Sequence, residues 1–230
     1  MSGIMMPMPT PSLKNSFPAP PPSQQEVDEF VTAAGKGDMV VVTAFLDKHI
    51  TSINQKGPLD HTAMTKAAAE GQKEMVELLL KKGAQIDARD NYNWTPLIYA
   101  AQRGRTPIVA LLLEKGAQIG ATAQQGWTAL MWAARFGYTG TVRILLEKGA
   151  EIGAVNTSGM TALKLAMAYK HGETAELIEQ WPELQRQRQE QERKNKEREL
   201  AEIKARELNA ERLEKLKNQR PPKPPLKKKR

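Results

Sequence analysis

Tryptophan, tyrosine and arginine are the residues of this chain whose spacing suggests a chemical role. Trp94 and Trp127 lie 33 residues apart and each precedes a threonine, while Tyr99 and Trp132, again 33 apart, each precede two alanines. These residue types supply most hot spots of protein interfaces, so the pattern predicts a surface that binds a protein or peptide. The candidate residues are Tyr92, Trp94, Tyr99, Arg103, Trp127, Trp132, Arg135 and Phe136, with Arg103 and Arg135 interpreted as one shared repeat position.

A second interpretation of the aromatic residues stays open, in which the rings pack on one another and stiffen the structure. Trp181 is assigned such a structural role, as a cover for the last apolar surface, and Pro182 is predicted to end the helix there. His61, which lies 33 residues before Trp94, is interpreted as a polar turn residue.

The sequence contains no comparable pattern of residues that would predict catalysis. The chain has no cysteine and three scattered histidines, and it lacks a glycine-rich phosphate loop, an HExxH motif and a GxSxG motif. Asp87 and Asp90 fall in polar stretches typical of turns. We therefore expect no enzyme, no small-molecule substrate, no cofactor and no metal site.

The elements that position the aromatic residues repeat with the same period. Thr62, Thr95, Thr128 and Thr161 each begin an alanine-rich segment, and a leucine-rich segment follows in each of the first three units. The threonines stand where a helix needs an N-cap, and glycines follow both segments. The pattern predicts pairs of short helices joined by polar hairpin loops. Since one pair cannot bury its own apolar face, the pairs must stack.

These motifs, such as Thr-Pro-Leu, paired alanines, Leu-Leu-Leu and Lys-Gly-Ala in a fixed frame, resemble ankyrin repeats. Three clear repeats begin near Asp60, Asn93 and Gly126, a fourth near Gly159 is degraded, and a further degraded unit precedes them. The resemblance implies an all-α ankyrin-repeat solenoid of about five repeats over residues 26–182. It also implies a partner on the concave face, which the hairpin tips and first helices line.

The chain departs from the family pattern at one position. The histidine that usually follows Thr-Pro-Leu, and hydrogen-bonds within the turn, is replaced by Thr65, Ile98, Met131 and Lys164. Some rigidity of the turns is expected to be lost, while the apolar frame should preserve the fold.

The flanking segments differ from the repeats. Residues 1–25 are rich in proline and methionine and are predicted to be disordered or polyproline II. Residues 183–219 lack glycine and proline and predict a long charged helix. Its leucines sustain no heptad register, so a solvated single helix is preferred to a coiled coil, and a helix induced by a partner stays open. Residues 220–230 form a basic proline- and lysine-rich tail.

The net charge of +8 belongs to the C-terminal part of the chain. Residues 1–182 hold 17 basic and 17 acidic residues, whereas residues 183–230 hold 17 and 9. Lys227, Lys228, Lys229 and Arg230 therefore support a second hypothesis, a nucleic-acid or anionic-membrane binder acting through the tail. The first hypothesis is a monomeric, non-enzymatic adaptor. With no signal-peptide pattern at the N-terminus, we expect the cytoplasm, or the nucleus in a eukaryote.

Overall fold

A computed structural model describes the protein over residues 20–218, with side chains to residue 215. Within these residues the fold is all-α, as predicted, and the only β-pairing consists of two isolated bridges, Lys56–Thr62 and Thr122–Thr128. The α-helices are α1 (Gln24–Lys36), α2 (Met39–His49), α3 (Ala63–Glu70), α4 (Lys73–Lys81), α5 (Pro96–Gln102), α6 (Thr106–Glu114), α7 (Ala129–Arg135), α8 (Thr139–Glu147), α9 (Ala162–Ala168) and α10 (Gly172–Asn218). Three short 3-10 helices, Ile50–Ser52, Pro58–Asp60 and Gln124–Gly126, lie in the loops.

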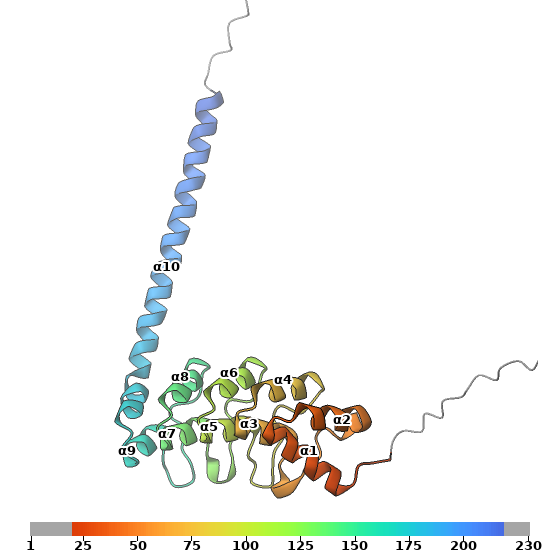
Figure 1. Cartoon of the computed structure of the whole chain (residues 1–230). Coiled ribbons are helices and arrows are strands. Elements are labelled where there is room, and N and C mark those ends of the chain that lie inside the picture. The colour runs from red at the N-terminus through yellow and green to blue at the C-terminus, as the bar shows by residue number, and fades with distance from the viewer. Residues whose placement is uncertain (1–19, 219–230) are drawn as a thin grey trace, which may run out of the picture. The chain divides into compact units, whose positions relative to one another are not determined.

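The chain divides between Ile178 and Glu179 into two compact units. In the first unit the helices form two rows, in which α1, α3, α5, α7 and α9 contact one another in order and α4, α6 and α8 lie beside them (Figure 1). Paired alanines occupy the first row, and Ala67, Ala100 and Ala133 are fully buried there. Small side chains let these helices approach closely, while Leu79, Leu112 and Leu145 fill the space between the rows.

The repeat threonines cap the first helices as predicted. The side-chain oxygens of Thr62, Thr95, Thr128 and Thr161 each accept a hydrogen bond from the backbone N–H three residues later. Each cap satisfies a donor that the helix itself leaves free. The period of 33 residues therefore sets where each first helix begins.

The residues that replace the family's histidine keep the turns packed. Ile98 and Met131 are buried in the core, and Thr65 is buried with its hydroxyl donating to the carbonyl of Thr62 at 2.8 Å. Lys164, in the degraded repeat, is exposed, and its ammonium donates to the carbonyl of Gly159 at 3.2 Å. Apolar burial takes the place of the lost bond at two of the four positions.

Neighbouring repeats are also joined by the residue that follows the left-handed position after each first helix, which is a glycine in the first four units and Lys170 in the last. The Gln72 amide donates to the carbonyl of Gly35 at 3.2 Å, and Arg105 Nε donates to that of Ala69 at 3.2 Å. His171 Nε2 lies 3.0 Å from the carbonyl of Arg135. At the same position Tyr138 packs its ring against Gly104. Each of these side chains thus covers the helix end of the preceding repeat.

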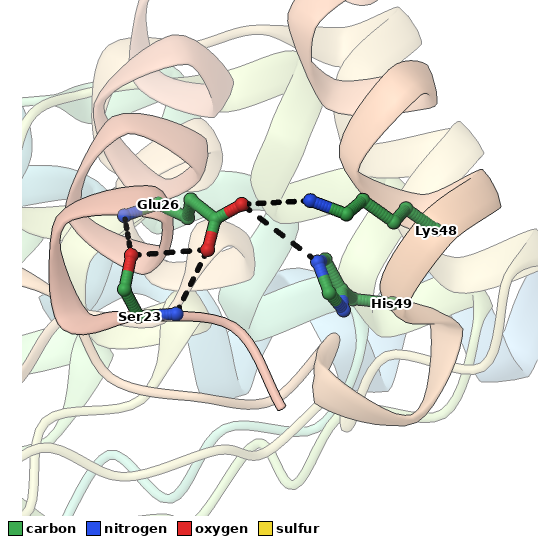
Figure 2. Close-up of polar contacts among 4 residues, drawn as sticks. All are labelled: Ser23, Glu26, Lys48 and His49. Atoms are coloured by element: carbon green, nitrogen blue, oxygen red, sulfur yellow. Dashed lines mark hydrogen bonds and ion pairs between the residues drawn. The ribbon is translucent and has the colours of Figure 1, made fainter. Parts of the chain in front are cut away.

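The first helix begins at Gln24, two residues before the predicted start of the repeats, because Ser23 and Glu26 form a capping box. The Glu26 carboxylate accepts from the Ser23 N–H at 2.9 Å and faces two side chains at the end of α2 (Figure 2). Lys48 Nζ lies 3.0 Å and His49 Nε2 3.9 Å from the same carboxylate oxygen. The hydrogen bond from Ser23, followed by that from Lys48, lowers the pKa of Glu26 to about 2.

The second unit contains the long charged helix that was predicted, but its path corrects one expectation. Pro182 does not end a helix, since α10 runs through it from Gly172 to Asn218. The fixed φ of proline suits a helix, and what is lost is the bond to the carbonyl of Ile178, four residues earlier. Strong helix formers on the C-terminal side continue the helix beyond this break.

Along the rest of α10 the side chains are solvated. Leu200, Ile203 and Leu208 are exposed. Trp181, which lies before this solvated part of the helix, is buried. Glu190 pairs with Arg193 at 2.9 Å and with Lys194 at 3.4 Å, both one turn further along the helix surface. None of the helices in residues 20–218 is both long and apolar enough to cross a membrane. The predicted disordered leader, up to residue 19, and the basic tail lie outside the described residues.

Candidate partner-binding surface

Aromatic rings from neighbouring repeats form a continuous cluster, which we call the aromatic surface and define by Trp94, Tyr99, Trp127, Trp132 and Phe136. Trp132, on α7, lies at its centre, with ring centroids 4.9 Å from Trp94, 4.4 Å from Trp127 and 6.1 Å from Phe136. Trp94 continues the cluster to Tyr99 at 4.9 Å. The loops before α5 and α7 supply Trp94 and Trp127, so loops and first helices build the surface together.

The guanidinium of Arg135, the last residue of α7, lies among four rings. Its Cζ atom is 5.4 Å from the ring centroids of Trp127 and Trp132, 5.8 Å from Phe136 and 4.8 Å from Tyr169. These distances are within the range of cation–π attraction, which holds the side chain in place. The site therefore presents a fixed cation in an aromatic surround.

The rings of this surface are not sealed in the core. Trp94, Trp127 and Trp132 are half-buried, and Phe136 is 41% exposed. Tyr92, at the tip of the loop before α5, is 59% exposed and makes no ring contact within the described residues. Trp181, by contrast, is buried. The aromatic surface thus offers ring edges and faces to solvent.

Asp90 positions part of this surface through hydrogen bonds to its loop and to Tyr99. Its buried carboxylate accepts from the N–H groups of Tyr92 at 2.8 Å and Trp94 at 2.9 Å, and from the hydroxyl of Tyr99. Burial, together with this last hydrogen bond, holds the pKa of Tyr99 well above its usual range. Asp90 is a turn residue, as expected, but it also ties the loop to α5.

No group of three or more histidine, aspartate or glutamate side chains in residues 20–215 could hold a metal ion. The polar groups that the surface can offer to a partner are therefore the guanidinium of Arg135 and the indole N–H groups of Trp94 and Trp127, because the Tyr99 hydroxyl already donates to Asp90. Such groups, set among apolar rings, can bind a chain segment by stacking, burial and hydrogen bonding.

A family model described as ankyrin repeats (3 copies) matches residues 30–123 and 118–186. Together the two matches span more than half of the chain. The chain belongs to the ankyrin-repeat family. Ankyrin repeats are in general protein–protein interaction modules, and the family is typically non-enzymatic.

One curated relative supports the same assignment over a short stretch. This chain is 42% identical over 57 residues to the Drosophila melanogaster protein named "Ankyrin repeat and KH domain-containing protein mask". The stretch is 25% of this chain and 1% of the fly protein, so the chain spans only a small part of that relative's length.

Arg103 and Arg135 were expected to occupy the same position of neighbouring ankyrin repeats, and this expectation is wrong by one residue. The period of 33 places Phe136 opposite Arg103 and places Arg135 opposite Gln102. The structure agrees, because Arg103 is the C-cap of α5 whereas Arg135 is the last residue of α7. Arg103 also lies apart from the cation–π cluster and pairs with Glu70 of the preceding repeat at 3.5 Å.

Three residues near the aromatic surface were not among the predicted site residues. Tyr169 lies 33 residues after Phe136, so extending the aromatic pattern by one repeat would have found it. Tyr138 contacts Phe136 at 6.0 Å, and His61 lies edge-on to Tyr99 at 5.0 Å. Burial lowers the pKa of His61. Besides its expected place in a turn, His61 therefore packs its ring against the edge of the aromatic surface.

Proposed function

We propose that this ankyrin-repeat protein is a non-enzymatic adaptor that binds a segment of another protein on its aromatic surface. The observation that carries the proposal is the half-exposed cluster around Trp132 and Arg135. Large apolar rings at solvent-facing positions of a soluble array cost free energy unless a partner covers them. Tyrosine, tryptophan and arginine also contribute more binding energy per residue than other types.

The alternative interpretation, that the rings stiffen the stack, accounts for part of the same contacts. Trp94 and Trp132 come from neighbouring repeats, and their contact at 4.9 Å joins those repeats. It does not account for Tyr92, which projects at a loop tip, or for the exposed side of Phe136. The proposal therefore assigns the inner rings to rigidity and the exposed rings to the partner.

Site-specific photo-crosslinking tests this assignment in the full-length chain. A photoreactive phenylalanine analogue is placed at Tyr92 or Phe136, and at Val40 as a control. Val40 is 78% exposed, on α2, away from the aromatic surface. After irradiation in cell extract, adducts identified by mass spectrometry are expected from the first two positions and absent from the third.

A matched substitution completes the test. Phe136→Ser in a chain crosslinked through Tyr92 should remove the adduct, whereas Val40→Ser should leave it in place. Absence of adducts from both Tyr92 and Phe136, or equal adducts from Val40, would contradict the proposed surface. The competing tail hypothesis predicts instead that adducts with nucleic acid disappear when Lys227, Lys228 and Lys229 become glutamine, with a steep dependence on salt.

A further inference from the structure

Arg135 differs from the arginines of the preceding loops and first-helix ends in having no oxygen partner within the described residues. Arg89 and Arg105 donate to backbone carbonyls at 3.2 Å, and Arg103 pairs with Glu70. Arg135 is half-buried among rings, yet its guanidinium contacts no carboxylate and no carbonyl within residues 20–215. A guanidinium carries five N–H donors, so the side chain is held in place with its hydrogen-bonding capacity unused.

The loops and first helices around Arg135 offer it no negative charge. The loop and first-helix segments 91–105, 122–138 and 155–171 contain Arg103, Arg105, Arg135, Lys164 and Lys170 and no aspartate or glutamate. The carboxylates at nearby positions of the preceding repeats already have partners, and the first of them, Asp60, accepts from the Asn91 amide. Glu70 pairs with Lys66 and Arg103, and Asp90 holds Tyr99 and its own loop. Positive charge on this side of the repeats is therefore unbalanced.

We propose that the partner is an acidic peptide and that Arg135 binds one of its carboxylates. This inference rests on the proposed function and deepens it by naming the chemistry of the partner. A guanidinium binds a carboxylate through two parallel N–H···O bonds, and such charge-assisted bonds are stronger than neutral ones. Because the rings already restrict Arg135, little side-chain entropy is lost when the carboxylate arrives.

The rings beside Arg135 define the rest of the segment. Phe136 and Tyr169 are 41% and 48% exposed and flank the guanidinium. A peptide that places a carboxylate on Arg135 therefore brings its neighbouring residues over these rings. The structure favours a segment in which acidic and apolar side chains alternate closely.

A nucleic acid is less consistent with the same surface. Binding to a phosphate backbone depends on several cations that neutralise successive phosphates. Residues 1–182 have no net charge, and Arg103 and Arg105 are engaged within the repeats. One unpaired guanidinium suits one carboxylate better than a track of phosphates.

The test begins with a random 15-residue peptide library displayed on phage and selected on the full-length chain. Parallel selections use Arg135→Gln and Arg143→Gln. Arg143 is exposed on α8, so its substitution removes the same charge away from the aromatic surface. Peptides selected on the unmodified chain and on Arg143→Gln should be enriched in aspartate and glutamate, and those selected on Arg135→Gln should lose the enrichment. The basic tail is identical in all three chains and cancels from the comparison.

The most enriched peptide is then synthesised with its acidic residues intact and with each replaced by its amide. Arg135→Gln should weaken the acidic peptide about tenfold or more, which corresponds to one charge-assisted pair of about 1.5 kcal/mol. The amide peptide should bind both chains equally, as a double-mutant cycle requires for a direct pair. Arg135→Lys, which keeps the charge but not the planar fork, should fall between the two.

Four results would overturn the proposal. Selected peptides without acidic enrichment, or an equal loss with Arg143→Gln, would exclude Arg135 as the binding centre while leaving a partner on the aromatic surface intact. Tighter binding of a single-stranded oligonucleotide than of any peptide, dependent on Arg135, would exclude the acidic peptide. Failure to select any peptide, together with no crosslinks from Tyr92 or Phe136, would reject the proposed function itself.

Discussion

The hydroxyl of Tyr99 donates a hydrogen bond to the buried carboxylate of Asp90, nine residues earlier in the chain. The same carboxylate accepts the N–H groups of Tyr92 and Trp94, so one side chain fixes both the loop and the helix that follows it. In the last repeat Asn156 occupies the matching position, and its amide oxygen accepts from Ser158 and Met160 at 3.0 Å. The backbone N–H groups of both loops therefore bond to a side-chain oxygen, from Asp90 in one and from Asn156 in the other. Of these two residues, Asp90 alone also accepts a hydrogen bond from a tyrosine.

Substitution at this pair should separate the two roles. Tyr99→Phe removes one hydrogen bond to a charged acceptor and should lower the free energy of unfolding by about 1.5–3 kcal/mol. Asp90→Asn keeps an oxygen for the two loop N–H groups, as Asn156 does, and should cost less than Asp90→Ala. Urea unfolding followed by circular dichroism measures all three. Equal losses for Asp90→Asn and Asp90→Ala would mean that the loop bonds contribute nothing.

Acidification should weaken the N-terminal helix pair through Glu26. Because hydrogen bonds from Ser23 and Lys48 lower the pKa of Glu26 to about 2 from 4.5, its contribution to stability is complete above pH 4.5 and is lost as the pH falls toward 2. A carbon-detected NMR titration should give a Glu26 midpoint near 2. Lys48→Met should move the midpoint upward, and a midpoint that stays near 4.5 in the unmodified chain would disprove the assignment.

Trp132 carries an unused donor at the centre of the aromatic surface. Its indole Nε1 is enclosed and has no hydrogen-bond acceptor within the described residues. Trp132→Phe keeps a ring against Trp94 and Trp127 and removes that donor, so it should change the free energy of unfolding by less than about 1 kcal/mol. Trp132→Ala opens a gap and should cost about 2 kcal/mol or more. Thermal and urea unfolding compare the variants, and equal losses would argue against a packing role for the ring.

Two features favour glycine at position 104, namely a left-handed backbone and the ring of Tyr138 close to where a Cβ atom would lie. Its φ is +63°, and an added Cβ would lie 2.8 Å from the Tyr138 ring, whereas Gly116, with φ +90°, has no atom within 4 Å of an added Cβ. Alanine at either site should cost about 1–2 kcal/mol from the left-handed backbone. Gly104→Ala should cost more than Gly116→Ala, and Tyr138→Ala should remove the excess. An equal cost at both sites in urea unfolding would show that Tyr138 yields freely.

The helical repeats and their caps could be predicted because their causes are local. A threonine N-cap, a run of alanines and a glycine at the helix end each act within a few residues, so the 33-residue period located the first helices of the repeats. The expectation for Pro182 failed for a related reason. A proline disfavours a helix locally, but the helix formers that follow outweigh that cost.

The aromatic residues could be selected from the sequence by type and period, whereas their grouping around Arg135 could not. Tyr169 and Arg135 are 34 residues apart, and their contact arises because adjacent repeats stack side by side. The sequence alone thus determined an all-α repeat array and the types of side chain on its loops and first helices, since both depend on short-range periodicity. Only the tertiary structure decided which arginine lies among the rings without a carboxylate, because packing between repeats sets both the distances and the burial.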